Sequence, residues 1–169
     1  MSVVAARRAA DSERLRAFAA AHPAALQILQ TEGNPPHRYL LRFVCRGVES
    51  LPGGRPRLRA THDVQIVLPT AYPIARPTAT VLTPVCNPHI FESGTVCLGD
   101  AAWSPAESLD LFVQRLRSIL VWDPLILDPG SPANWTAMRW AEAHRRDLPL
   151  DEPSFGGAAP AAPATIDWR

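Results

Sequence analysis

Cys97 is the residue of this sequence best placed to do chemistry. It follows a glycine turn at Gly94 and lies ten residues beyond the triplet that begins at Asn87, within the run NPHIFESGTVCLGDAAWSP of residues 87–105. Residues 78–82, TATVL, are apolar and β-branched enough for a strand, whereas the prolines and glycine that follow are incompatible with regular structure. We therefore expect Cys97 to lie in a long ordered loop.

A thiol in such a loop has two interpretations. The thiolate is the reactive form, and neighbouring donors favour it, so a thiol beside an asparagine, a histidine and free backbone amides can be a nucleophile. Judged by the residue alone, a buried and inert cysteine is the commoner case. The residues around Cys97 favour the nucleophile.

Short motifs on both sides of Cys97 resemble, in order, those of ubiquitin-conjugating enzymes. The resemblance extends from about the first helix to Arg146, and the spacing from Tyr72 to Cys97 needs no gap. The matching segments are LPTAYPIARP (68–77) for the family's FPxxYPxxPP, NPHI (87–90) with Gly94 for its HPNI and glycine, VCL (96–98) for its ICL, WSPA (103–106) for its WSPA, and DPLILDP (123–129) for its DPNPxDP. An ordered set of this kind is far more specific than any single motif.

The resemblance implies an α+β fold, with a four-stranded antiparallel meander sheet flanked by an N-terminal helix, a central helix and a C-terminal helix. It also implies an activity: Cys97 accepts a ubiquitin-like modifier protein from an activating enzyme as a thioester and passes it to an amine of a target protein. A ligase is a further expected partner in some systems. No cofactor is expected, because nucleotide is consumed at the earlier activation step.

One departure from the family concerns the triplet beside the thiol. The family's His-Pro-Asn stands here as Asn87-Pro88-His89, with the outer residues exchanged. In the family the asparagine supports the loop and stabilises the oxyanion formed when an amine attacks the thioester. Either Asn87 or His89 could donate to that oxyanion, or both could only brace the loop.

Three further sites follow from the resemblance. Asp128 aligns with the acidic residue that faces the thiol and helps to deprotonate the incoming lysine, although an Asp before a Pro is more often a turn former. Two neighbouring loops are expected to bind ligases, with Ile74 as an apolar contact. The residues predicted to bind partners are Tyr72, Ile74, Trp103, Pro105 and Ala106.

Composition excludes several other classes. At 169 residues and 47% apolar content the chain fits one domain with a real core, and no stretch approaches the roughly 20 apolar residues that span a membrane. A net charge of +1 gives no case for nucleic acid, and the cluster Arg55, Arg57 and Arg59 fits a solvated loop. The three cysteines lack disulfide or zinc spacing. We expect a cytoplasmic protein without secretion signal or metal.

All 17 basic residues are arginine, and the chain has no lysine. Codon bias is one explanation, because Ala, Pro and Arg are abundant in products of GC-rich genomes. The other is functional: an enzyme that carries an activated acyl thioester gains by offering no lysine amine of its own. The sequence leaves both open.

Hydrophobic periodicity and turn residues predict the elements. The N-terminal helix covers about residues 2–21, the central helix covers residues 109–120 with Ser108 as N-cap, and a further helix opens at Ser131-Pro132 and runs to about Arg146. The four strands are expected at residues 26–30, 39–45, 63–68 and 78–82, with loops at 33–37 and 52–56.

The chain is expected to divide into a catalytic domain, residues 1–148, and a Pro/Ala-rich mobile tail, residues 149–169. The terminal IDWR of that tail is interpreted as a frayed end more readily than as a docking motif.

Two other functions stay open. A catalytically silent relative could bind ubiquitin-like proteins as a module, although such variants usually lack the cysteine that is present here. The second alternative is a cysteine hydrolase that uses Cys97, His89 and an acid. His89 lies eight residues before the thiol on the same loop, and the order of catalytic residues in papain-like enzymes does not require such an arrangement. The departures from the eukaryotic pattern point to a bacterial relative, and a bacterial antiphage conjugation operon is the setting that the resemblance implies.

Overall fold

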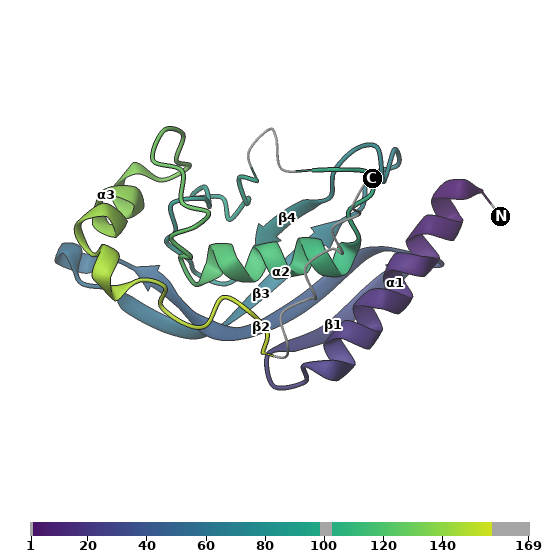
Figure 1. Cartoon of the computed structure of the whole chain (residues 1–169), viewed down its shortest axis with the longest axis horizontal. Helices are drawn as coiled ribbons and strands as arrows, with labels where there is room; N and C mark the ends of the chain where they lie inside the picture. Colours follow the sequence, from purple (N-terminus) through teal and green to yellow (C-terminus); the bar gives the residue numbers. More distant parts are fainter. Residues whose placement is uncertain (1, 99–102, 157–169) are drawn as a thin grey trace, which may run out of the picture.

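Four antiparallel strands form one sheet in chain order, β1-β2-β3-β4, in a computed structural model that describes residues 2–98 and 103–156 (Figure 1). The predicted meander is confirmed. The strands are β1 (Leu26–Gly33), β2 (Pro36–Ser50), β3 (Arg57–Val67) and β4 (Thr78–Val81). Three of them, β1, β2 and β3, are longer than the alternation of apolar residues predicts. The ends of β1 and β2 pair as far as Gly33 and Pro36, so the loop expected at residues 33–37 is a tight turn, and the far ends of β2 and β3 pair in a protruding hairpin.

A bulge in β2 allows this hairpin to continue past the core. The pairing shifts between Val44 and Gly47, after which Gly47 pairs with Arg59 and Val48 with Leu58. Gly47 is required at this point, because a Cβ atom there would lie 2.6 Å from Nε2 of His62 and 3.0 Å from the Leu120 carbonyl oxygen. The bulge thus lets β2 pass close beneath the end of the central helix.

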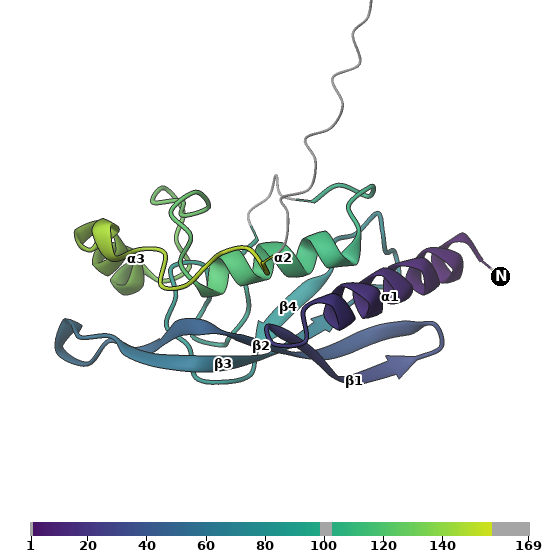
Figure 2. The same cartoon turned by 60° about the horizontal axis from the view of Figure 1, so that its bottom comes forward.

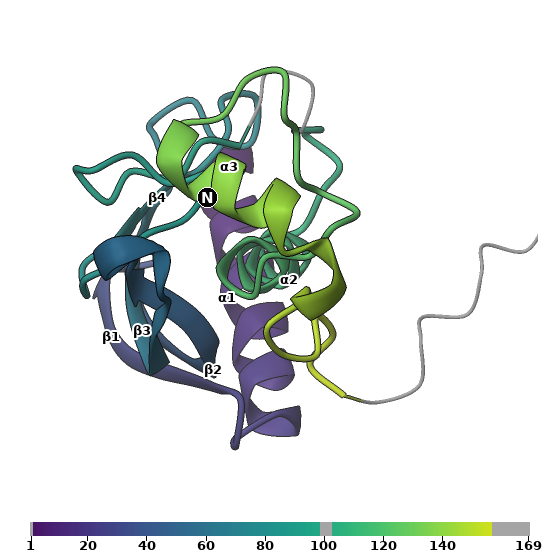
Figure 3. The ribbon, with the colours of Figure 1, turned by 90° about the vertical axis from the view of Figure 1, so that its left-hand side faces the viewer.

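Helices α1 (Val3–Ala21) and α2 (Leu109–Leu120) cover one face of the sheet, and α3 (Trp135–Ala143) lies beyond the end of α2 (Figures 2 and 3). Two short 3₁₀ helices occupy Pro52–Gly54 and Arg145–Asp147. Within the described ranges 2–98 and 103–156, no helix combines the length and apolar character that crossing a bilayer requires.

The third helix begins later than predicted. It starts at Trp135 with Asn134 as N-cap, whose side-chain oxygen accepts from the Ala137 amide at 3.0 Å. Ser131 and Pro132 are not helical, because the amides of Ala133 and Asn134 donate to the Pro88 carbonyl at 2.8 and 3.2 Å. This segment is therefore used to hold the loop that precedes the thiol.

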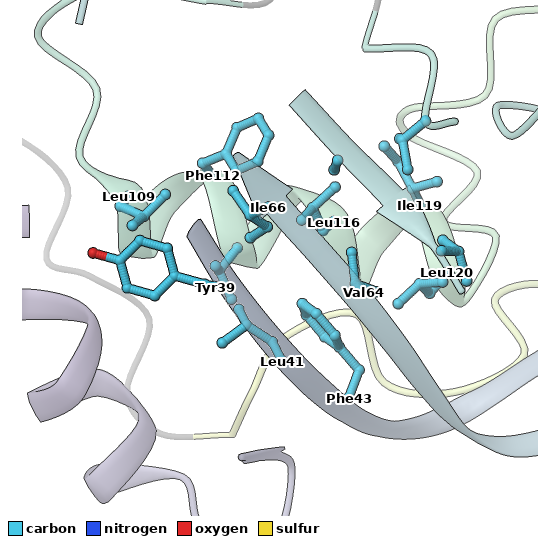
Figure 4. Packing of buried hydrophobic residues seen from close by; sticks show 14 of the residues in the cluster. Tyr39, Leu41, Phe43, Val64, Ile66, Leu109, Phe112, Leu116, Ile119 and Leu120 are labelled. Atoms are coloured by element: carbon cyan, nitrogen blue, oxygen red, sulfur yellow. The ribbon is translucent and has the colours of Figure 1, made fainter. Parts of the chain in front are cut away.

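The main core lies between the sheet and α2. Alternate residues of β2 and β3 point toward α2, and α2 presents apolar residues at helical spacing toward the sheet (Figure 4). Full burial of one such side chain contributes roughly 1.5–3 kcal/mol. The facing residues are Tyr39, Leu41 and Phe43 of β2, Val64 and Ile66 of β3, and Leu109, Phe112, Leu116, Ile119 and Leu120 of α2.

Residues 149–156 return along α2 to the end of α1 (Figures 1 and 2). The Leu150 amide donates to the Val121 carbonyl at 2.8 Å, and Arg117 Nε donates to the Glu152 carbonyl at 3.0 Å. The ring of Phe155 lies 5.0 Å from that of Phe18. These contacts favour a domain that extends to residue 156. The mobility expected of the tail stays a prediction. Its residues 157–169 lie outside the part of the chain that the structure describes.

His62 of β3 is a fully buried histidine, and it generates a prediction about pH. Burial, and then the charge of Arg59, lower the pKa of His62 from 6.5 to about 4. Between these pH values the unfolded chain binds the proton and the folded chain does not. The contribution of His62 to the free energy of unfolding is therefore fully present above pH 6.5. It is lost as the pH falls from 6.5 toward 4, and the loss is on the order of 3 kcal/mol for a pKa shift of this size.

We expect His62→Gln to remove most of this pH dependence. Urea unfolding at several pH values between 7 and 4 measures it, with His37→Gln at a partly exposed histidine as the control. If His62→Gln and wild type lose the same free energy of unfolding over this interval, the buried histidine does not contribute to the acid sensitivity.

Candidate active site

Cys97 lies on an irregular loop that is attached to the sheet by backbone hydrogen bonds. It is a free and partly exposed thiol, and its amide donates to the His89 carbonyl at 2.7 Å. The Val96 amide donates to the Ala79 carbonyl of β4 at 2.9 Å, and the Gly94 carbonyl accepts from the Val81 amide at 2.8 Å. The position of Cys97 in an ordered loop is therefore as expected.

Gly94 makes this attachment possible. Its φ of +85° lies in the region that glycine occupies without strain, and a Cβ atom there would lie 2.3 Å from the Val81 carbonyl oxygen. A larger residue would force the loop away from β4, and with it the thiol three residues later.

The side chain of Asn87 is fully buried, and both ends of its amide are used inside the fold. Its Nδ2 donates to the carbonyl of Ile119 in the last turn of α2 at 2.7 Å, and its Oδ1 accepts from the His89 amide at 2.8 Å. The last carbonyls of a helix have no partner within the helix, so Asn87 satisfies one of them. Asn87 thereby fixes the triplet to α2.

His89 connects the thiol loop to the loop that follows α2. Its ring is buried, Nε2 accepts from the Asp128 amide at 3.1 Å, and the ring also hydrogen bonds to the Ile126 backbone. Burial lowers the pKa of His89, opposed by the nearby charge of Asp128. A neutral ring is what this geometry requires, because a protonated Nε2 could not accept.

Asp128 lies at the surface on the far side of this bridge. Its Oδ1 accepts from the Gly130 amide at 2.8 Å, which is the turn-forming role that an Asp before Pro129 commonly has. The backbone contacts thus bring Asn87, His89, Cys97 and Asp128 into one region. No cluster of His, Cys, Asp or Glu able to hold a metal ion occurs among residues 2–98 and 103–156.

The other two cysteines lie in different surroundings. Cys45 is buried in the core, and burial raises the pKa of its thiol to about 12. Cys86 is partly buried beside α3, and burial raises its pKa as well. Both are poor nucleophiles at neutral pH, because little thiolate is present.

The residues predicted to bind partners divide into two groups. Ile74 is 81% exposed, and Pro105 and Ala106 are also exposed. Tyr72, in contrast, is fully buried, and Trp103 is partly buried with its Nε1 donating to the Pro73 carbonyl at 2.7 Å. Tyr72 therefore cannot touch a partner directly, and it supports the loop from which Ile74 projects.

Two residues of this region were not found from the sequence. The backbone amide of Asn134 donates a hydrogen bond to the Pro88 carbonyl and so holds the triplet, and Asp11 is a buried carboxylate that contacts the loop of Tyr72. A signal for Asp11 was present: it lies four residues before Leu15 and seven before Phe18, on the apolar face of α1. A charged residue on such a face indicates a buried partner.

The α+β fold described above is that of ubiquitin-conjugating enzymes. The family profile described as "Ubiquitin-conjugating enzyme" matches residues 54–147, more than half of the chain. The chain belongs to the ubiquitin-conjugating enzyme family.

Curated relatives agree with this assignment at low identity. Ubiquitin-conjugating enzyme E2 T of Mus musculus is 26% identical over 119 residues, which cover 60% of this chain and 58% of the relative. Ubiquitin-conjugating enzyme E2 PEX4 of Gibberella zeae is 38% identical over 60 residues, which cover 34% of this chain and 35% of the relative. The chain thus spans less than two thirds of these relatives.

Solved structures agree on the fold. A ubiquitin conjugating enzyme from Trypanosoma cruzi has a TM-score of 0.60 and 18% identity, with 85% of this chain and 93% of that chain covered. The enzyme UbcA1 from Agrocybe aegerita has a TM-score of 0.53 and 20% identity, with 71% and 83% covered. The α+β fold expected from the sequence is confirmed.

The double role of Asn87 leads to a stability prediction. Asn87→Ala removes two buried hydrogen bonds and leaves the Ile119 carbonyl without its side-chain partner, so we expect the free energy of unfolding to fall by about 3 kcal/mol. Urea unfolding measures the change. The control is Ser93→Ala, at an exposed turn of the same loop, for which we expect a change within about 0.5 kcal/mol. Equal effects of the two substitutions would contradict a bracing role for Asn87.

Proposed function

We propose that this protein accepts the C-terminus of a ubiquitin-like modifier on Cys97 as a thioester and transfers it to an amine of a target protein. The observation that carries the proposal is the partly exposed thiol of Cys97 on a loop fixed by Asn87 and His89, in a member of the ubiquitin-conjugating enzyme family. The partners are then an activating enzyme, the modifier, a target and, in some systems, a ligase. No cofactor takes part.

Two acyl transfers make up the proposed reaction. In the first, the Cys97 thiolate attacks the carbonyl carbon of the modifier's thioester on the activating enzyme; a new C–S bond forms, and the enzyme's thiolate leaves. In the second, an amine nitrogen attacks the same carbon, the C–S bond to Cys97 breaks, and the amine loses a proton as the amide forms. Each step passes through a tetrahedral oxyanion.

In this proposal Asn87 and His89 act by positioning. The amide of Asn87 is committed to Ile119 and the His89 backbone, and the His89 ring is committed to the loop of Asp128. Neither side chain has a donor directed at Cys97 in this arrangement. The backbone amide of Asp128 is held by His89, and its exposed carboxylate is the group that orients the incoming amine and receives its proton.

The partner surface in this proposal consists of Ile74, Pro105 and Ala106 on two neighbouring loops. All three are exposed and small or apolar. Tyr72 and Trp103 support it from beneath. An activating enzyme and a ligase would use the same surface in turn.

Two alternatives are disfavoured by particular residues. A silent binding module has no need of the partly exposed thiol or of the fixed loop around it. A cysteine hydrolase needs a histidine free to take the thiol proton, whereas Nε2 of His89 already accepts from the Asp128 amide.

We further propose a bacterial and cytoplasmic setting, in an operon for antiphage conjugation. The abundance of Ala, Pro and Arg and the absence of Lys support a GC-rich bacterial source. The genes adjacent to the one for this chain test the proposal: an activating enzyme, a ubiquitin-like protein and a deconjugating metalloprotease are expected there, and their absence would contradict it.

The thioester generates the first functional prediction. Incubation with the cognate activating enzyme, modifier and ATP should yield an adduct that reducing agent removes, seen as a mobility shift on gels without reductant. We expect Cys97→Ala to form none and Cys97→Ser to form an oxyester that resists reductant. Cys45→Ser and Cys86→Ser serve as matched controls that keep charging. An adduct on Cys97→Ala would show that another residue carries the modifier.

The absence of lysine leads to a second functional prediction. Without a side-chain amine, the charged protein can modify itself only at its N-terminal amino group. Prolonged charging should therefore leave almost no reductant-resistant self-conjugate, as measured by gels and peptide mass spectrometry. Resistant adducts on internal residues would show that the thioester is transferred to nucleophiles other than amines.

A further inference from the structure

We propose that Asp11 of α1 is a positioning residue for partner binding, because its buried carboxylate ties α1 to both loops that carry the partner surface. We call these the docking loops, residues 68–77 and 103–108. The inference rests on the proposed function, since the docking loops are the surface proposed above for the activating enzyme. Asp11 itself is fully buried and touches no partner.

Three groups from different parts of the chain donate to the Asp11 carboxylate. Arg7, one turn earlier in α1, donates from Nε to Oδ2 at 2.6 Å. The hydroxyl of Tyr72, in the first docking loop, donates to the same oxygen. The amide of Leu109, at the start of α2, donates to Oδ1 at 3.4 Å. Ser108 makes no capping bond with its own side chain, so Asp11 supplies the acceptor there.

The remaining donors of Arg7 extend this arrangement to the second docking loop. Nη1 donates to the Pro105 carbonyl at 2.7 Å, and Nη2 donates to the Glu107 carbonyl. The guanidinium also lies 5.5 Å from the centre of the Tyr72 ring. One arginine, oriented by Asp11, therefore contacts both docking loops at once.

The two docking loops also contact each other. Trp103 Nε1 donates to the Pro73 carbonyl at 2.7 Å, and the rings of Tyr72 and Trp103 lie 5.9 Å apart. The bonds form a closed circuit from α1 through the second docking loop to the first and back to Asp11. Ile74, Pro105 and Ala106 project from this circuit.

Physical chemistry explains why the carboxylate controls the loops. A buried carboxylate is stable only if donors satisfy it, and breaking a buried pair costs far more than removing a surface pair. Burial and the Asp11 carboxylate raise the pKa of Tyr72, so its hydroxyl stays protonated and can donate. The loops are rich in proline and have no ladder of backbone hydrogen bonds, so side-chain bonds contribute strongly to their relative position. Arg8 of α1 adds one bond to the first docking loop, from Nη2 to the Pro69 carbonyl at 2.9 Å, but the Asp11 circuit is the one that joins both loops. A preorganised surface binds more tightly because less ordering accompanies binding.

The test separates partner binding from the chemistry of the thiol. Charging is measured with ubiquitin, the ubiquitin-activating enzyme and ATP over a range of concentrations of this protein, which gives its KM and kcat. In parallel, a ubiquitin thioester of a small thiol charges Cys97 without any enzyme. Hydrogen exchange followed by mass spectrometry reports on the docking loops.

We expect Asp11→Asn to raise the KM about tenfold, with a much smaller change in kcat, and to speed exchange in both docking loops. The ratio of enzyme-dependent to small-thiol charging falls accordingly. Tyr72→Phe removes one donor and keeps the Arg7 pair, so its effect is smaller, and the double variant should be no worse than Asp11→Asn. Val64→Ala, a core substitution under α2, is the matched control that lowers stability without changing the KM.

Three results would overturn the inference: unchanged exchange in the docking loops of Asp11→Asn, a KM that rises equally in Val64→Ala, or additive effects of Asp11→Asn and Tyr72→Phe. Failure of wild type to charge from the activating enzyme counts against the proposed function for ubiquitin. Hydrogen exchange then decides the inference alone, because faster exchange in the docking loops supports it and unchanged exchange contradicts it.

Discussion

The hydrogen bond from Asn87 to the carbonyl of Ile119 is the contact on which the thiol loop depends most. The loop has no regular structure of its own, so its position relative to α2 must come from side chains. Asn87 supplies it at the last turn of α2, where the Ile119 carbonyl accepts from Asn87 Nδ2 as well as from the Trp122 amide, and the other end of the Asn87 amide holds the His89 amide. His89 then holds Cys97 through its carbonyl and the Asp128 loop through its ring. The positions of the site residues therefore depend on hydrogen bonds to the C-terminal end of α2, which is itself packed on the sheet.

The exchanged order of the triplet has a simple physical explanation. The first position faces a helix end and needs a donor for a carbonyl and an acceptor for an amide, which an asparagine side chain provides at once. The third position faces the loop after α2 and needs an acceptor for the Asp128 amide, which a neutral histidine provides. Each residue type thus matches the groups around it, and the buried environment keeps the histidine neutral.

Much of the architecture could be predicted because it follows from patterns along the chain. Residues 63–67 of the alternating stretch 63–68 lie in β3, and α2 lies where its apolar residues recur at helical spacing. The extension of the hairpin, the late start of α3 and the contacts of Asp11 could not be predicted in this way. They depend on partners distant in sequence: Gly47 on His62, Asn134 on Pro88, and Asp11 on Tyr72. The roles predicted for Cys97, Asn87, His89 and Asp128 came from motif resemblance and stay predictions; the resemblance grouped these residues but could not give their individual bonds.

The segment of residues 149–156 has a practical consequence for anyone who shortens this protein. Composition alone invites a cut at residue 148, where the proline-rich stretch begins. Such a fragment would lose Phe155, whose ring lies against Phe18 and within 6.2 Å of the Phe43 ring, and would open apolar surface between α1 and α2. It would also take the Glu152 carbonyl away from Arg117, a nearly buried cation in the helix that supports the thiol loop. Fragments intended for crystals or labelling should therefore retain the chain through Gly156, and fusions belong after it.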